Sequence, residues 1–166
     1  MQRQAISMAL AAGLLSSAAM AFTTTLGTIG VAYAHDEHET FSAGEPGNPK
    51  KPARPVQITM REGDGEMHFI PNHIEVRKGE QIKFVIRNNG ALDHEFVLAT
   101  AAENLKHEDL MKKYPDMEHA DPNAIRVGPQ KTGEIVWKFT KAGTFEFDCL
   151  IPGHREAGMT GQVIVK

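Results

Sequence analysis

The chain has 166 residues, a formal net charge of −3 at pH 7 and a single cysteine. One cysteine excludes an internal disulfide, and a mildly acidic balance gives no support for nucleic-acid binding. Once a short N-terminal segment is set aside, the length fits one domain with a sizeable core.

Residues 1–34 have the pattern of an export signal. Arg3 is the only charged residue before Asp36, residues 5–21 are mostly apolar, and residues 32–34 form an Ala-x-Ala cleavage pattern. An uncleaved membrane anchor is the alternative, because the uncharged stretch is long enough to span a bilayer. Serine, threonine and glycine interrupt that stretch and no basic cluster follows it. We therefore expect cleavage and a periplasmic protein without stable membrane association.

Residues 35–54 are polar, rich in proline, glycine and acidic side chains, and lack a hydrophobic period, which predicts a flexible arm. The predicted domain covers residues 55–166. Short segments of alternating apolar and polar residues follow one another there, separated by turns with glycine or proline. This pattern is typical of an all-β sandwich or barrel. The expected strands cover residues 56–60, 67–70, 73–76, 81–87, 94–98, 134–139, 143–148 and 161–166.

One stretch of this domain has no strand period. Residues 101–113 are rich in good helix formers. Tyr114 precedes Pro115, and proline disfavours helical geometry in the residue before it. We therefore expect one helical insertion around residues 101–114, followed by a loop to Asn123.

The loop after the penultimate expected strand carries Cys149, His154 and Met159, with four residues between successive members. A thiolate, an imidazole and a thioether are ligands that copper prefers, and two histidines, one cysteine and a weak axial methionine make a blue-copper site. The alternative is a buried or stray free thiol. An unpaired cysteine in an exported protein is prone to oxidation unless a metal protects it. The loop therefore predicts three copper ligands, and a second histidine must come from elsewhere.

His94 is the candidate for that ligand. It follows the turn at residues 88–90 and begins an apolar strand, so it can lie at the same end of the sandwich as the cysteine loop. One histidine upstream and a Cys-His-Met cluster downstream is the pattern of the cupredoxins, and residues 55–166 resemble that family. The loop spacing is similar to that of rusticyanin and auracyanin. The helical insertion and the nearby histidines and methionines resemble small periplasmic copper-tolerance cupredoxins of the CopI type.

The resemblance implies a cupredoxin-like Greek-key β-sandwich with one type 1 copper per chain. In that family pattern His94 and His154 bind copper through Nδ1, Cys149 binds through its thiolate, and Met159 is the long axial ligand. Such a site changes little when an electron moves, which favours fast transfer, with His154 as the electron port. Glu95 departs from the small polar residue that many relatives carry after the first histidine. The resemblance therefore does not predict the hydrogen bonds behind the ligands.

Further histidines and methionines are candidates for a second copper site. His35 would become the amino terminus after cleavage, where its amine and imidazole, with His38, would chelate copper. His107 and Met111 are four residues apart and share a face of the expected helix. Residues that would join them in an auxiliary copper store are Met60, Met67, His68, Met117 and His119. The alternative, which we favour, is a solvated arm with ordinary core methionines and surface histidines.

Three functions compete for this ligand set. We favour a single-electron carrier that serves copper tolerance; the alternative is a copper sequestration or oxidation protein that uses the additional sites. An oxidase or nitrite reductase is disfavoured, because Asp148 and Leu150 flank the cysteine where those enzymes place histidines, and no ligand position is left for a substrate. The sequence does not exclude cuprous oxidase activity. We expect a monomer whose redox partner is a protein such as a cytochrome or copper oxidase.

Overall fold

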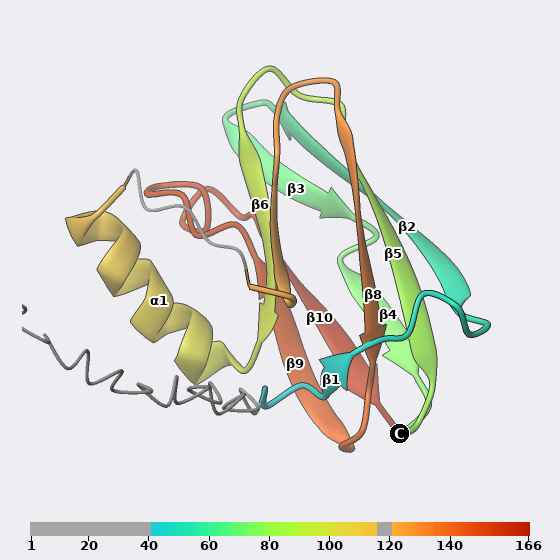
Figure 1. Ribbon diagram of the computed structural model, residues 1–166. Coiled ribbons are helices and arrows are strands. Elements are labelled where there is room, and N and C mark those ends of the chain that lie inside the picture. The colour runs from blue at the N-terminus through green and yellow to red at the C-terminus, as the bar shows by residue number, and fades with distance from the viewer. Residues whose placement is uncertain (1–40, 116–120) are drawn as a thin grey trace, which may run out of the picture. The chain divides into compact units, whose positions relative to one another are not determined.

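The structure is a computed structural model that describes residues 41–115 and 121–166. Within these residues, two five-stranded sheets pack face to face as a sandwich (Figure 1). The first sheet has the order β1–β8–β5–β2–β3, with bounds Glu45–Pro46, Thr132–Lys138, Gln81–Asn88, Arg54–Gly63 and Glu66–Ile70. The second has the order β4–β10–β9–β6–β7, with bounds His73–Val76, Thr160–Val165, Gly143–Asp148, His94–Ala99 and Ala124–Val127.

Both sheets are mixed. Strands β2 and β5 pair in parallel, as do β4 and β10, and the other neighbours are antiparallel. The expectation of an all-β sandwich with one helix is confirmed. The antiparallel pairing of β6 and β9 matters most for the site, because it sets Val97 opposite Asp148. The start of β6 therefore lies beside the segment that follows β9.

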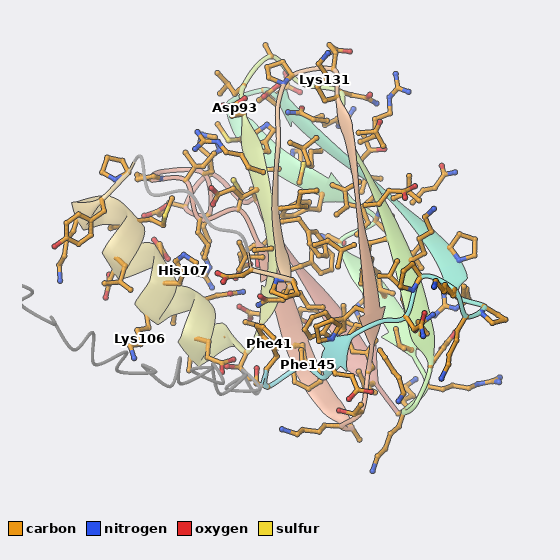
Figure 2. The ribbon with its side chains drawn as sticks, viewed as in Figure 1. Phe41, Asp93, Lys106, His107, Lys131 and Phe145 are labelled. Atoms are coloured by element: carbon orange, nitrogen blue, oxygen red, sulfur yellow. The ribbon has the colours of Figure 1, made fainter. Side chains whose placement is uncertain are left out.

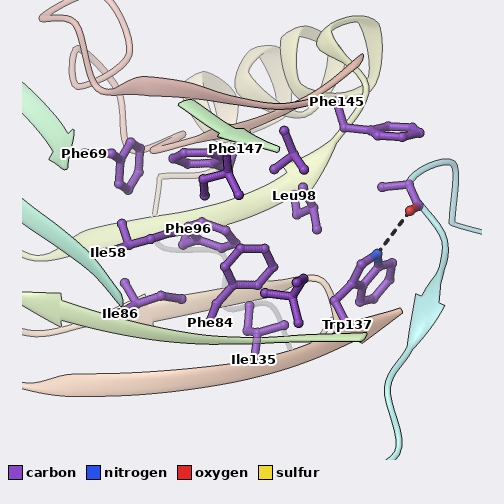
Figure 3. Packing of buried hydrophobic residues seen from close by; sticks show 14 of the residues in the cluster. Ile58, Phe69, Phe84, Ile86, Phe96, Leu98, Ile135, Trp137, Phe145 and Phe147 are labelled. Atoms are coloured by element: carbon purple, nitrogen blue, oxygen red, sulfur yellow. Dashed lines mark hydrogen bonds between the residues drawn. The ribbon is translucent and has the colours of Figure 1, made fainter. Parts of the chain in front are cut away.

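Apolar side chains from the inner faces of both sheets form one core. On β5, Ile82, Phe84 and Ile86 are fully buried while the residues between them are partly exposed, as the twofold period of a strand requires. On the inner face of the second sheet, the rings of Phe96 on β6 and Phe147 on β9 stack with 5.1 Å between their centroids (Figure 3). This packing fixes the two strands from which predicted ligands extend.

Strand β6 is buried along its whole length, because helix α1 covers the face that is turned away from the core (Figure 1). The helix spans Ala101–Lys113, which confirms the expected insertion. Thr100 caps its start. The Thr100 hydroxyl accepts the backbone N–H of Glu103, and the Glu103 carboxylate accepts the backbone N–H of Thr100. Met111 is fully buried on the face of the helix that meets the sheet.

The sequence predicts a flexible arm over residues 35–54, but the part from residue 41 onward makes defined contacts with the first sheet. The indole N–H of Trp137 donates to the carbonyl of Ala43 at 3.2 Å (Figure 3). Strand β1 pairs with β8, and the Gln81 side-chain amide donates to the carbonyl of Asn48 at 3.0 Å. These partners are remote in sequence, so no local pattern signals them.

The predicted signal peptide, residues 1–34, and the first residues of the predicted arm, 35–40, lie outside the described residues. In the described part of the chain, no helix is long and apolar enough to cross a membrane.

Candidate metal centre

Three of the four predicted ligands meet at one end of the sandwich, near the position of Asp93 in Figure 2. His94 begins β6, Cys149 follows β9, and His154 lies in the loop between β9 and β10. The Nδ1 atoms of the two histidines are 3.2 Å apart, and Cys149 Sγ is 3.4 Å from His154 Nδ1. Among residues 41–115 and 121–166, this is the one group of three histidine, cysteine or acidic side chains whose ligand atoms all lie within 4.8 Å.

The Cys149 thiol is completely buried and accepts hydrogen bonds from the backbone. The N–H of Glu95 donates to Sγ at 3.3 Å. Burial raises the pKa of the Cys149 thiol to about 12, although the backbone N–H groups of Glu95 and Ile151 act in the opposite direction. The thiol is therefore protonated at neutral pH in the metal-free chain. A metal at this position takes the thiolate, so its binding releases a proton.

Glu62, near the end of β2, supports His94 from behind. Its Oε1 accepts from His94 Nε2 at 2.7 Å. Burial alone would raise the pKa of Glu62, but hydrogen bonds from the backbone N–H groups of Leu92 and Ala91 and from His94 lower that pKa to about 2. The ionised carboxylate can only accept, so His94 Nε2 carries the proton and the Nδ1 lone pair faces the other ligands. No sequence motif reveals this role of Glu62, because nothing in the local pattern links it to a histidine 32 residues away.

His154 is the one predicted ligand that reaches the protein surface. It is partly exposed, whereas His94, Cys149 and Met159 are fully buried. Burial lowers the pKa of His154, and the neighbouring His94 lowers it further. The imidazole is therefore neutral at pH 7 and its Nδ1 can bind a metal. Next to it, Pro152 and Gly153 are exposed.

Backbone hydrogen bonds hold Met159 next to two of these ligands. Its carbonyl accepts the N–H of Cys149 at 3.1 Å, and its N–H donates to the carbonyl of His154 at 3.1 Å. Its side chain belongs to the same buried core as Cys149. These bonds join the two ends of the loop, so that Cys149, His154 and Met159 lie near one another. The axial role of the Met159 sulfur stays a prediction.

The chemistry of these donor atoms fits copper. Two imidazole nitrogens and one sulfur lie within 4.8 Å of one another, close enough for one metal ion to contact all three. Nitrogen and thiolate donors in this ratio, with a thioether close by, are the ligands of a type 1 copper site. Copper bound there supplies a one-electron couple. The chain itself supplies a rigid, mostly buried set of ligands that excludes water.

A buried polar network ties the ligand loop to helix α1, and the two lie side by side in Figure 1. Its centre is Asp148, the last residue of β9, which is fully buried. The Asp148 carboxylate accepts hydrogen bonds from three side chains: Asn104 Nδ2 at 2.9 Å, Arg155 Nε at 3.3 Å and the Thr160 hydroxyl. Nearby, Lys112 of the helix pairs with Glu156 of the loop at 3.2 Å. The helix thus braces the loop that carries the ligands.

Where the structure describes them, the candidates for a second copper site fall into two groups: Met60, Met67 and His68 on the paired strands β2 and β3, and His107 and Met111 on α1. Met60 is part of the main core, whereas Met111 belongs to a small cluster under α1. His68 pairs with Glu66 at 3.4 Å, and His107 projects from α1 into a separate small pocket (Figure 2). The remaining candidates lie outside the described residues: His35, His38, Met117 and His119.

Comparison with known proteins agrees with this site. Residues 56–166 match the family of copper binding proteins described as the plastocyanin/azurin family. Over 135 residues the chain is 50% identical to the copper-resistant cuproprotein CopI of Rubrivivax gelatinosus, which covers 81% of this chain and 79% of that protein. The copper-resistant cuproprotein CopI of Pseudomonas aeruginosa is 34% identical over 152 residues, covering 74% of this chain and 82% of that protein.

Among solved structures, auracyanins have a similar fold. Reduced auracyanin from Roseiflexus castenholzii gives a TM-score of 0.57 at 20% identity, covering 70% of this chain and 99% of that chain. Auracyanin A from Chloroflexus aurantiacus gives a TM-score of 0.54 at 24% identity, covering 68% and 99%. At these identities the likeness concerns the fold, and it matches the two-sheet sandwich described above.

Proposed function

Because the chain belongs to the plastocyanin/azurin family of copper-binding proteins, we propose that it is a periplasmic electron carrier that serves copper tolerance. The observation that carries this proposal is that the ligand atoms of His94, Cys149 and His154 all lie within 4.8 Å of one another. The site holds one copper as a type 1 centre. The proposed activity is the transfer of single electrons to and from this copper.

The burial of the ligands supports electron transfer. Three predicted ligands are fully buried, and the loop that carries three of the four is fixed at both ends by strands β9 and β10. A site held in this way keeps its geometry when the charge on the metal changes, so little reorganisation opposes the transfer. His154 reaches the surface beside the exposed Pro152 and Gly153, and this patch is where a redox partner would dock.

The surroundings of Cys149 argue against a copper enzyme. Asp148 is fully occupied by hydrogen bonds to Asn104, Arg155 and Thr160, and Leu150 packs in the cluster under α1. Neither neighbour of the cysteine can therefore lead to a second copper centre. With four protein ligands, the proposed centre has no open position where a substrate would bind.

The copper-tolerance role is supported by relatives. Two proteins named copper-resistant cuproproteins align over most of their own length with this chain, at 50% and 34% identity. Sequestration through additional histidine and methionine sites is the alternative function. Met60 lies in the main core and Met67 packs against it, whereas Met111 lies in the cluster under α1, and this separation of the candidate methionines favours a single centre over a copper store.

Growth on copper tests this proposal. A strain that lacks the gene is expected to lose tolerance to copper, because no protein then handles the metal at this site. The wild-type gene should restore growth, and a Cys149→Ser gene should not. The purified protein should contain one copper per chain. Normal growth of the deletion strain on copper, combined with a respiratory or photosynthetic defect, would contradict the tolerance role, and several coppers per chain would favour sequestration.

A further inference from the structure

The Glu62 carboxylate binds the backbone before His94 as well as the His94 ring. Its Oε2 accepts the backbone N–H of Ala91 at 3.0 Å, and its Oε1 accepts the backbone N–H of Leu92 at 3.0 Å and Nε2 of His94 at 2.7 Å. One side chain therefore holds both the imidazole and the backbone that leads into it. The side chain is 24% exposed and the ring of His94 is fully buried, so these bonds lie at the edge of the core.

The carboxylate fits only because residue 90 is glycine. A Cβ atom on Gly90 would lie 2.2 Å from Glu62 Oε2 and 2.3 Å from Oε1, far inside contact distance. The backbone of Gly90 is not in the left-handed region, so alanine there would conflict with the Glu62 carboxylate, which would have to move, and not with the backbone conformation. Asn88 fixes the same turn from its other side, because its Oδ1 accepts the N–H of Gly90 at 2.8 Å and its Nδ2 donates to the carbonyl of Leu92 at 2.7 Å.

We propose that Glu62 is a positioning residue for the copper site, which fixes the orientation and the tautomer of His94 and strengthens it as a ligand, and that Gly90 provides the space for its carboxylate. The inference rests on the copper site and not on the electron-carrier role. Carboxylate–histidine–metal arrangements fix the ring and raise the basicity of the ligand nitrogen. A stronger nitrogen donor favours Cu(II) over Cu(I), and so does a negative charge close to the metal. Glu62 thus lowers the reduction potential.

The first test compares Glu62→Gln with Glu66→Gln. Glutamine at position 62 would turn its amide N–H₂ toward backbone N–H groups, so at least one of the bonds is lost. We expect the affinity for Cu(II) relative to Cu(I) to fall about tenfold, which raises the reduction potential by about 59 mV for a one-electron couple. Glu66 is the matched control, because it lies on the neighbouring strand with a side chain 70% exposed and pairs with His68. Glu66→Gln removes the same charge, but Glu66 does not touch a ligand. The reduction potential of this variant should therefore shift clearly less than that of Glu62→Gln.

A second test separates positioning from charge. Gly90→Ala leaves the charge unchanged but displaces the carboxylate, so the potential should rise as it does in Glu62→Gln. In a Glu62→Ala background the added methyl group has room, and Gly90→Ala should then cause no further rise. In the metal-free protein, the ¹⁵N resonances of His94 should report a proton on Nε2, and this proton preference should weaken in Glu62→Gln.

Two results would overturn the inference. One is a potential shift in Glu62→Gln no larger than in Glu66→Gln, and the other is an effect of Gly90→Ala that persists unchanged after Glu62 is removed. Each of these is distinct from failure of the copper site itself. If the site is wrong, neither the wild type nor the Glu66→Gln protein binds copper with a thiolate absorption band, whereas the His94 resonances of the metal-free protein still report on Glu62.

Discussion

Cys149→Ser is expected to abolish the intense visible absorption band of the copper-loaded protein. That band arises from charge transfer between the thiolate and the metal, and Cys149 is the only cysteine in the chain. A serine hydroxyl is a much poorer ligand for copper than a thiolate. Copper affinity should fall by more than the 10–100-fold that is typical when a residue behind a ligand is changed. Absorption spectroscopy and a competitive copper titration measure the two effects.

The fold should survive this substitution, because serine is close to cysteine in size and the residue contributes one side chain to a large core. Circular dichroism of the metal-free variant is therefore expected to match that of the metal-free wild type. A visible band that persists in Cys149→Ser would show that the thiolate is not the source of the colour. The assignment of the site would then be wrong.

Asp148→Ala is expected to reduce the free energy of unfolding by about 3 kcal/mol, because it removes the buried carboxylate that pairs with Arg155 and accepts the Thr160 hydroxyl. The Asp148 side chain is fully buried and accepts from Asn104, Arg155 and Thr160. Its loss removes one of the links between α1 and the loop that carries His154, whereas the Lys112–Glu156 pair remains. We therefore also expect faster amide exchange in that loop. Urea unfolding of the metal-free proteins measures the stability difference.

Glu134→Ala is the matched control for this prediction. Glu134 pairs with Lys83 at 2.9 Å, but both side chains are about half exposed, and exposed pairs contribute about 0–1 kcal/mol. Its substitution should change stability little and leave exchange in the ligand loop unaltered. Equal destabilisation by the two substitutions would mean that the network around Asp148 has no special role in bracing the site.

The ligands were predictable because their signal is local or nearly so. Cys149, His154 and Met159 lie within one loop, and their spacing alone indicates the ligand types and their order. The prediction of His94 as a ligand needed only one further step, that a turn and an apolar strand bring it to the same end of the sandwich as the loop. The structure places its Nδ1 beside that of His154, as the family pattern implies.

The support behind the ligands was not predictable. Glu62 reaches His94 across 32 residues, and Asn104 reaches Asp148 across 44. Each of these side chains is polar and lies in an element with no distinguishing motif, so only the folded arrangement shows the pairing. The resemblance predicts the ligands themselves but, with Glu95 after the first histidine, not the hydrogen bonds behind them.

Two parts of the fold also escaped prediction. Strand β7, Ala124–Val127, follows a polar loop and is too short to show a period, but it pairs with β6 and completes the sheet beside His94. Residues 41–54 look like a solvated arm, yet Trp137 and Gln81 hold this segment through hydrogen bonds to its carbonyl groups. In both cases tertiary partners supply what the local sequence lacks.

The most direct measurement is a crystal structure of the copper-loaded protein with anomalous scattering at the copper edge. We predict one copper ion bound by Cys149 Sγ and by the Nδ1 atoms of His94 and His154, with the Met159 sulfur at a longer axial distance. A copper ion bound elsewhere, or a His94 ring turned away from a metal that Cys149 binds, would contradict the account.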